Sequence, residues 1–204
     1  MVPKNQNLIS LFPPSFEGKV SVEEALLKRR SVRSFKEEPL TLKEISQILW
    51  AAQGITEPSF GGRTAPSAGA LYPIEIYLIV KNVKELSPGV YKYQPENHSL
   101  VFLFEEKISS QLADAALGQS FIAKAPAVLV IAGVFERTTK KYGERGERYV
   151  FMEAGHVSQN VYLQCVSLNL GTVAVGAFED EKVKQILKMD SKEYPLYIMP
   201  IGRK

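Results

Sequence analysis

The sequence predicts a single α+β domain, and three observations support this fold class. Two segments begin with residue pairs that cap helices, and a third, longer segment is apolar at helical spacing. Between them lie runs of β-branched and aromatic residues that are typical of strands. No internal repeat and no linker divides the 204 residues, a length that suits one sizeable core.

The composition is that of an ordinary globular protein, with 45% hydrophobic and 23% charged residues. The net charge of +3 comes from residues spread along the chain, so we expect no nucleic-acid partner. Cys165 is the one cysteine and falls in an apolar helical pattern, which predicts a buried packing role. His98 and His156 lack metal-ligand spacing, so we expect no metal. No signal-like or membrane-length segment is found, so we expect no membrane contact and a cytoplasmic protein.

The N-terminal quarter is predicted to form an arm followed by two helices. We divide the chain into an arm over residues 1–20, irregular up to residue 18, and a domain over 21–204. Serine or threonine with glutamate three residues later marks the start of each helix, and Gly54 ends the second. The two capping pairs are Ser21 with Glu24 and Thr41 with Glu44.

A loop, a strand and a hairpin are predicted next. Residues 55–70 are dense in Gly, Pro, Ser and Thr, and a loop of this length is usually functional or disordered. Ile74–Val80 is rich in β-branched and aromatic residues and predicts a strand. Val90–Tyr93 and Leu100–Phe104 flank a turn-rich segment, which predicts a β-hairpin.

The C-terminal half is predicted to alternate between helices and strands. We expect helices over Ile108–Leu117, Tyr149–Leu170 and Asp180–Leu187, and strands over Pro126–Gly133, Thr172–Phe178 and Tyr194–Ile201. The charged segment Arg137–Arg148 contains glycine and predicts a mobile loop. The longest helix is apolar on most faces and closed by Gly171, which places it at the centre of the core. Its polar residues are expected to form structural hydrogen bonds; they are Glu153, His156, Gln159 and Asn160.

Three arginines and two serines fall within the seven residues Arg29–Phe35, directly after the first predicted helix. Guanidinium groups are permanently charged and planar, and they make paired donor contacts to the oxygens of a phosphate or an anionic ring. The alternative is a solvated basic helix end, which the helix dipole favours. The cluster is therefore a candidate anion site, and other segments of the chain are needed to distinguish this interpretation from a solvated basic helix end.

Four separated motifs resemble those of the nitroreductase-like flavoproteins and occur in the same order. They are Arg29–Phe35, Ala65–Pro73, Gly171–Phe178 and Pro200–Arg203. The Ala-Leu-Tyr-Pro ending of the second motif is closest to the azoline-forming peptide dehydrogenases of the SagB type. The resemblance covers the chain from about residue 20 to the C-terminus. It implies a three-layer fold, with a central, mostly antiparallel sheet flanked by helices, and an intertwined homodimer.

The resemblance also implies that these motifs bind FMN at the dimer interface. The implied contacts to the phosphate and ribityl end are Arg29, Arg30, Ser31 and Arg203. The implied contacts to the ring are Arg33, Val175, Gly176 and Ala177, together with Pro66, Ser67, Ala68 and Gly69 from the partner subunit. A cation at the pyrimidine edge would stabilise the reduced, anionic ring and raise its potential. No side chain is assigned as a general acid or base.

The resemblance implies an enzyme in which NAD(P)H reduces the flavin, which then reduces a small nitro or quinone acceptor by ping-pong hydride transfer. A second reading is a SagB-type dehydrogenase that oxidises a peptide azoline and passes the electrons to oxygen. The segment Ala70–Pro73 favours it, whereas the short chain and the unmatched Lys–Tyr pair disfavour it; the nearest residues to such a pair are Lys140, Lys141 and Tyr142. A third reading is a flavin-binding protein without redox turnover.

Overall fold

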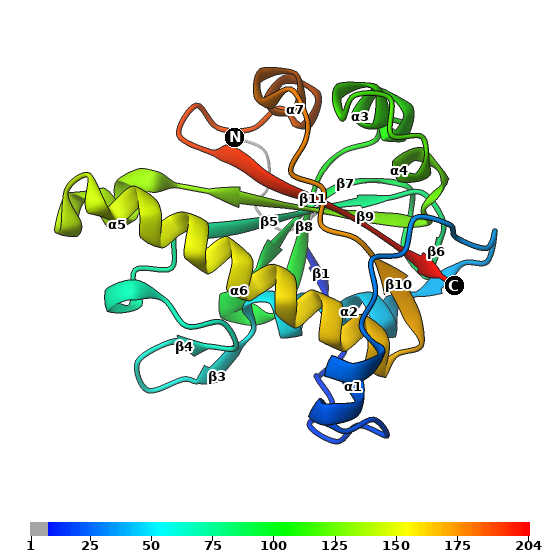
Figure 1. Ribbon diagram of the computed structural model, residues 1–204, viewed down its shortest axis with the longest axis horizontal. Coiled ribbons are helices and arrows are strands. Elements are labelled where there is room, and N and C mark those ends of the chain that lie inside the picture. The colour runs from blue at the N-terminus through cyan, green and yellow to red at the C-terminus, as the bar shows by residue number, and fades with distance from the viewer. Residues whose placement is uncertain (1–7) are drawn as a thin grey trace.

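The computed structural model describes residues 8–204, and a seven-stranded sheet forms its centre (Figure 1). The strand order is β1-β8-β7-β5-β9-β11-β10, and neighbouring strands all pair antiparallel. The strands are β1 (Leu8–Ser10), β5 (Ile74–Val80), β7 (Gly89–Gln94), β8 (Ser99–Phe104), β9 (Ala127–Gly133), β10 (Leu170–Thr172) and β11 (Tyr194–Arg203). The predicted antiparallel central sheet is confirmed.

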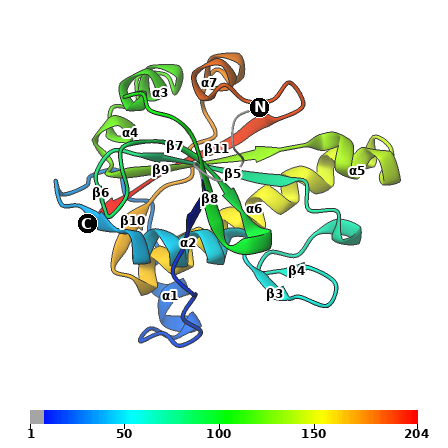
Figure 2. The ribbon, with the colours of Figure 1, turned by 180° about the vertical axis from the view of Figure 1, so that it is seen from behind.

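Helices cover both faces of this sheet and give the molecule three layers (Figures 1 and 2). On one face lie α2 (Leu42–Gln53) and α6 (Arg145–Ser167), and on the other lie α3 (Ser109–Ala115), α4 (Phe121–Lys124) and α7 (Asp180–Leu187). Both α1 (Val22–Lys28) and α5 (Phe135–Tyr142) pack against α6. No helix within residues 8–204 combines the length and the apolar character needed to cross a bilayer.

Side chains along β5 are divided between the two hydrophobic cores, one on each face of the sheet. Ile74 and Ile76 belong to the core beneath α2 and α6, whereas Tyr77 and Ile79 belong to the core beneath α3, α4 and α7. The neighbouring β9 is buried at all seven positions because helices cover both of its faces. In the sequence, β9 is therefore a continuous apolar run and β5 an apolar run interrupted only by Glu75, and both strands were predicted correctly.

The helix caps predicted in the N-terminal quarter are present in the structure. Thr41 and Glu44 form a reciprocal capping box, in which the Glu44 carboxylate accepts the Thr41 N–H at 2.8 Å. Ser21 likewise caps α1 by accepting the Glu24 N–H at 3.1 Å. Gly54 ends α2, and its N–H bonds the Trp50 carbonyl at 2.7 Å. A Cβ at Gly54 would lie 2.1 Å from the Trp50 ring, so the packing requires glycine there.

The mobile loop predicted over Arg137–Arg148 is wrong, because this segment is helical. It comprises most of α5 and the start of α6, separated by Gly143 in a left-handed conformation (φ 59°). The charges that suggested a loop lie on the exposed side of α5, whereas Thr138 is fully buried. Gly146 lets the two helices meet, since a Cβ there would lie 2.9 Å from the Thr138 and Thr139 backbone.

Three further predictions need correction. The 55–70 loop contains a small hairpin of β3 (Ile55–Glu57) and β4 (Gly62–Arg63), and the short 3-10 helix Ala68–Ala70. The longest helix ends at Ser167 rather than Leu170, because left-handed Asn169 reverses the chain and Gly171 enters β10. The strand predicted over Thr172–Phe178 stops at Thr172, beyond which only Val175 bridges β11, at Ile198.

The remaining small sheet pairs β2 (Leu40–Thr41) with β6 (Val83–Lys84) in parallel.

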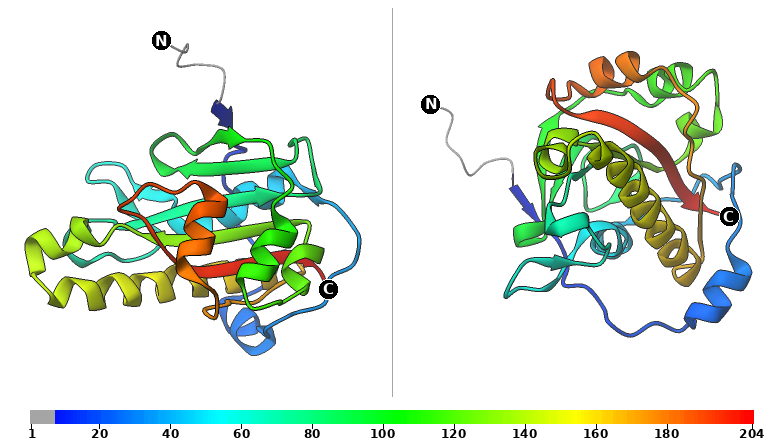
Figure 3. Two further views of the ribbon diagram at one scale, coloured as in Figure 1. Left: turned by 90° about the horizontal axis from the view of Figure 1, so that it is seen from above. Right: turned by 60° about the vertical axis from the view of Figure 1, so that its left-hand side comes forward.

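The predicted irregular arm contains the short strand β1, which pairs with β8 at the sheet edge. The first seven residues of the arm lie outside the described residues. From Leu11, whose N–H bonds the His98 carbonyl at 3.1 Å, the chain runs along the outside of the molecule to α1 (Figure 3). The arm is therefore tied to the domain at the β1 end.

Candidate functional site

Three of the four predicted motifs meet at one edge of the sheet. The Val32 N–H donates to the Thr172 carbonyl at 2.9 Å, and the Lys36 N–H donates to the Arg203 carbonyl at 3.0 Å. The arginine-bearing segment thus lies beside β10 and the end of β11. Gly171 and Gly202 pair with each other across these strands, and a Cβ on either would approach Val32 or Phe35 within 2.8 Å. Glycine is needed at both positions because the segment packs directly on the strands.

Tyr162, on α6, joins the first motif to the third. Its hydroxyl accepts the Ala174 N–H at 2.8 Å and shares a hydrogen bond with the Ser31 hydroxyl at 3.0 Å. The Arg29 guanidinium lies over its ring, 5.1 Å from the centroid. Sequence reasoning missed this residue, which falls in the apolar stripe of α6. A buried tyrosine needs a partner for its hydroxyl, and that requirement is the signal that could have identified it.

The arginines of the first motif differ in their surroundings. Within residues 8–204, no carboxylate forms an ion pair with Arg29, Arg30 or Arg33. Arg30 donates to the Leu27 carbonyl at 3.0 Å and to the Arg29 carbonyl at 2.7 Å, so it closes the end of α1 as a basic helix end would. Arg29 and Arg33 keep guanidinium groups without an anionic partner and can receive an anion.

Arg33 also lines a cavity of about 710 Å³ between residues 33–38 and α4. Four cationic side chains and two carboxylates contribute to its wall; they are Arg33, Lys36, Lys81, Lys124, Glu37 and Glu38. Cations outnumber carboxylates there, so the region around Arg33 favours a negatively charged group.

Among the described residues, Arg203 forms an ion pair with Glu44, unlike Arg29 and Arg33. Its Nη1 and Nη2 lie 2.7 and 3.0 Å from the two Glu44 carboxylate oxygens. Burial by itself would raise the pKa of Glu44, but the hydrogen bonds from Arg203 and Thr41 outweigh it and hold the pKa below its usual value. The Nε of Arg203 is 4.0 Å from Glu38. A phosphate contact by Arg203 remains a prediction, and it would have to share the guanidinium with Glu44.

The third motif exposes its backbone at the predicted ring contact. Val175 is buried and exchanges two backbone hydrogen bonds with Ile198, both at 2.9 Å. Gly176 and Ala177, which follow it, are exposed. Only ring atoms of Tyr197 approach a Cβ built at Gly176, at 3.6 and 3.9 Å, so the space in front of this backbone is open.

The second motif lies apart from the other three. Its Ala68 N–H donates to the Glu153 carboxylate at 2.9 Å, and the Ser67 hydroxyl accepts the Tyr72 N–H at 2.9 Å. Glu153 precedes Tyr162 by nine positions on α6, which separates the two contacts by roughly 14 Å along the helix axis. Pro66 and Gly69 are exposed at this end. Within one chain, the four motifs therefore form two separate surfaces.

The polar residues of α6 have the predicted structural role in two cases. Asn160 donates to the Thr64 carbonyl at 3.2 Å, and Glu153 holds Ala68, whereas His156 is exposed. One oxygen of Glu153 is buried without a partner, and burial raises the pKa of this carboxyl. The buried packing role predicted for Cys165 is confirmed. Within residues 8–204, no group of three potential metal-ligating side chains is found.

Lys141 and Tyr142 lie directly against the second motif. A Cβ built at Gly69 would be 2.7 Å from the Tyr142 hydroxyl and 2.9 Å from the Lys141 Nζ. Gly69 itself has a left-handed conformation (φ 63°). Sequence reasoning places these two residues among the nearest to a Lys–Tyr pair but does not assign them, because the sequence offers no convincing match. The helical structure of α5 places both side chains beside the predicted flavin-contacting loop.

Comparisons with known proteins agree with this architecture. Residues 26–203 match the family described as the nitroreductase family. The nitroreductase-family protein MJ1384 of Methanocaldococcus jannaschii is 57% identical over 91% of this chain and 92% of its own. A nitroreductase crystal structure from Ralstonia eutropha superposes with a TM-score of 0.85 at 30% identity, covering 99% of this chain and 91% of that one. The microcin B17-processing protein McbC of Escherichia coli is 27% identical over 98% of this chain and 77% of its own.

Proposed function

This chain belongs to the nitroreductase family of oxidoreductases, and from that premise we propose that it is an FMN-dependent reductase. In this proposal NAD(P)H is the electron donor and a small nitro or quinone compound is the acceptor. The observation that carries it is the pair of guanidinium groups of Arg29 and Arg33, which have no carboxylate partner within the described residues and lie on the segment beside β10. A single cysteine, with no second one to form an intramolecular disulfide, suits a reducing compartment, and we propose a cytoplasmic location.

The residues present fit FMN. A phosphate dianion requires cationic donors, and Arg29 supplies one that Tyr162 orients from below. Ser31, fixed by the same tyrosine, would hold the ribityl end. Arg33 would face the pyrimidine edge of the ring, and the open backbone at Gly176 would donate to ring N5. When bound, FMN supplies the hydride acceptor of the first half-reaction and the hydride donor of the second.

A homodimer would complete this site. The second motif lies too far along α6 to join the arginines of its own chain, so a second copy would have to supply it. Several apolar side chains are exposed on α1 and the N-terminal half of α6; they are Val22, Leu26, Leu27, Phe151 and Met152. Exposed apolar side chains in such number are typical of a surface that another protein covers. We propose that a second copy covers them and brings Pro66, Ser67, Ala68 and Gly69 to the flavin.

The proposal is tested by anaerobic reduction of the purified protein. We expect a yellow protein with bound FMN, bleached by NADH or NADPH and reoxidised by a nitro or quinone acceptor. A colourless protein that rejects added FMN would refute flavin binding. A flavin that neither nicotinamide can reduce would refute the reductase while leaving flavin binding intact.

One observation favours a second function, the oxidation of a peptide azoline. Lys141 and Tyr142 lie against Gly69, and a Lys–Tyr pair is what the resemblance to SagB-type dehydrogenases requires. The similarity to McbC supports the same reading. In this alternative the two side chains would hold or move a proton beside the substrate. Turnover of a peptide azoline with oxygen, lost in Tyr142→Phe and without NAD(P)H oxidation, would replace the reductase with this function.

A further inference from the structure

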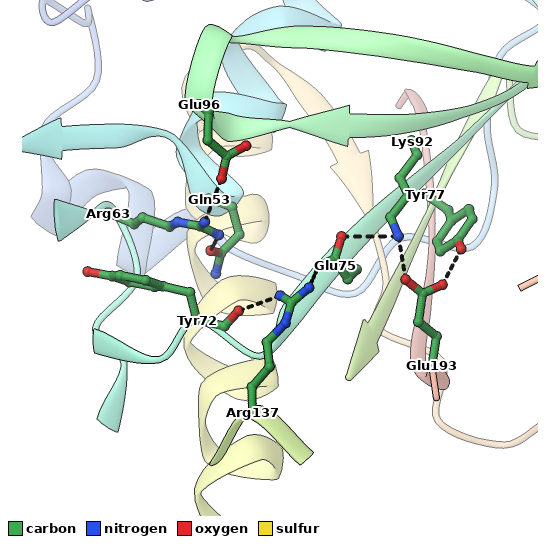
Figure 4. A network of polar contacts seen from close by, with 9 residues as sticks. All are labelled: Gln53, Arg63, Tyr72, Glu75, Tyr77, Lys92, Glu96, Arg137 and Glu193. Carbon is green, nitrogen blue, oxygen red and sulfur yellow. Dashed lines mark hydrogen bonds and ion pairs between the residues drawn. The ribbon is translucent and has the colours of Figure 1, made fainter. Parts of the chain in front are cut away.

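Behind the second motif lies a cavity of about 520 Å³ with charged walls. It is bounded by the end of β7 and the turn that follows it, by the start of β5, and by Arg63, Leu71 and Tyr72. Figure 4 shows the polar network around it, in which three cations contact three carboxylates. The cations are Arg63, Lys92 and Arg137, and the carboxylates are Glu75, Glu96 and Glu193.

Two of these cations, Lys92 and Arg137, both contact the carboxylate of Glu75. Lys92 contacts Glu75 at 3.2 Å and also contacts Glu193, which accepts the Tyr77 hydroxyl as well. Arg137 contacts Glu75 and donates to the Tyr72 carbonyl at 2.9 Å. Both cations therefore already have a carboxylate partner that is largely buried.

Arg63 is held rigidly but is poorly neutralised. Its Nη1 donates to buried Gln53 at 2.9 Å, and its guanidinium lies over the Tyr72 ring, 4.4 Å from the centroid. Only 11% of its side chain is exposed, and burial lowers the pKa of this cation. Its one carboxylate contact, 3.2 Å from Nη2, is Glu96, whose side chain is 64% exposed.

The Nε of Arg63 is buried and has no hydrogen-bond partner. Nε and Nη2 form one edge of the guanidinium, and a carboxylate can span that edge with its two oxygens. Glu96 uses this edge with a single oxygen. Glu96 is the exposed partner of this pair, and an incoming carboxylate would replace its charge beside the buried guanidinium, so that anion could displace Glu96 at small cost.

We propose that this cavity binds a small organic carboxylate, which takes the Nε and Nη2 edge of Arg63 in place of Glu96. A singly charged group matches this edge, whereas a phosphate dianion would add a second negative charge to a cavity that Glu75 also lines. The cavity is not lined by Arg29, Arg33 or residues 66–69, so acetate binding can be tested without flavin. It would, however, contact the flavin loop through Tyr72, whose ring lies on Arg63.

The test follows the Nε–H signal of Arg63 in ¹⁵N-labelled protein, identified by its loss in Arg63→Lys. Acetate is the probe, acetamide is its uncharged analogue, and chloride keeps the ionic strength constant. We expect acetate to shift the signal saturably and acetamide to leave it unchanged. An absent or unsaturable shift in both the parent protein and Glu96→Gln would refute the site.

Glu96→Gln removes the competing carboxylate and should tighten acetate binding by up to about fivefold, the contribution of an ion pair with one exposed partner. Glu106→Gln is the matched control, because it removes the same charge from an exposed pair with Lys188 outside this cavity. Acetate affinity in this control should equal that of the parent. Equal tightening in both variants would show a general charge effect and overturn the proposal.

Discussion

At the scale of single residues, Tyr162 connects two motifs of the candidate site, because its hydroxyl bonds both the Ser31 hydroxyl and the Ala174 N–H. Replacing it with phenylalanine keeps the ring beneath Arg29 but leaves the Ala174 N–H and the Ser31 hydroxyl without this partner. We expect Tyr162→Phe to lower the free energy of unfolding by about 1–3 kcal/mol and to weaken FMN binding. Urea denaturation and flavin titration measure the two effects. Unchanged FMN affinity would show that Tyr162 has only a packing role.

Arg33 and Arg203 should affect different properties of a bound flavin. Arg33→Gln should lower the reduction potential more than the affinity, because it removes a cation from the ring edge. Arg203→Ala should weaken FMN binding more than it lowers the potential. Spectroelectrochemistry and flavin titration give the two quantities. Equal effects of both variants on both quantities would contradict these assignments.

The Arg203–Glu44 pair predicts a pH dependence of stability. The pKa of Glu44 is lower in the folded state than its usual value of 4.5, so the charged carboxylate stabilises the fold above that pH. This contribution should be lost as the pH falls through the folded-state pKa. We therefore expect Glu44→Gln to be less stable than the parent at pH 7, and the difference to shrink below about pH 4.5. A difference that stays constant from pH 7 to pH 3 in denaturation experiments would argue against it.

At the scale of secondary structure, two glycines on the same helical layer should respond oppositely to alanine. Gly54→Ala forces a Cβ against the Trp50 ring and should destabilise the protein by about 1–3 kcal/mol. Gly155, within α6, has no atom within 4 Å of a built Cβ, so Gly155→Ala should stabilise it by roughly 0.5–1 kcal/mol. Thermal and urea unfolding test both. Stabilisation by both would mean that α2 shifts to accommodate the new methyl group, and destabilisation by both would contradict the open space at Gly155.

The elements that could be predicted from sequence are those whose signals are local. Thr41, Glu44 and Gly54 mark both ends of α2 by cap chemistry, and the apolar run of β5 reflects burial on both faces. The α5–α6 junction could not be predicted in this way. Its charges suit either a loop or a solvated helix face, and only the packing of Gly146 against Thr138 and Thr139 distinguishes them.

The same limit applies to the candidate site. The arginine–serine cluster is visible in the sequence because its charges are adjacent. Its partners are not visible, because Tyr162 follows Ser31 by 131 positions and Glu44 precedes Arg203 by 159. Such contacts depend on how the sheet edge, α2 and α6 come together. The sequence motifs therefore indicate which segments form the candidate site, but they do not identify the residues that hold these segments together.

At the scale of the whole molecule, the proposed dimer can be tested through its exposed apolar surface. Leu27, on α1, is 73% exposed. If a second copy covers it, Leu27→Asp should yield a monomer that has lost most of its FMN, because a charge would be buried without a partner. Leu117→Asp, at an exposed position after α3, is the control and should remain dimeric. Analytical ultracentrifugation and flavin absorbance report both properties, and a flavin-loaded monomer from Leu27→Asp would exclude an interface site.

The meeting of residues 29–35 with Gly171 and Gly202 has a consequence for biosynthesis. The ribosome makes the arginine-bearing residues 29–35 long before β10 and β11, the strands on which they rest. Until β10 and β11 have been synthesised and paired, these arginines have no fixed positions. The proposed anion-binding surface would therefore form only after β11 has been made, and we expect cofactor loading to follow that step.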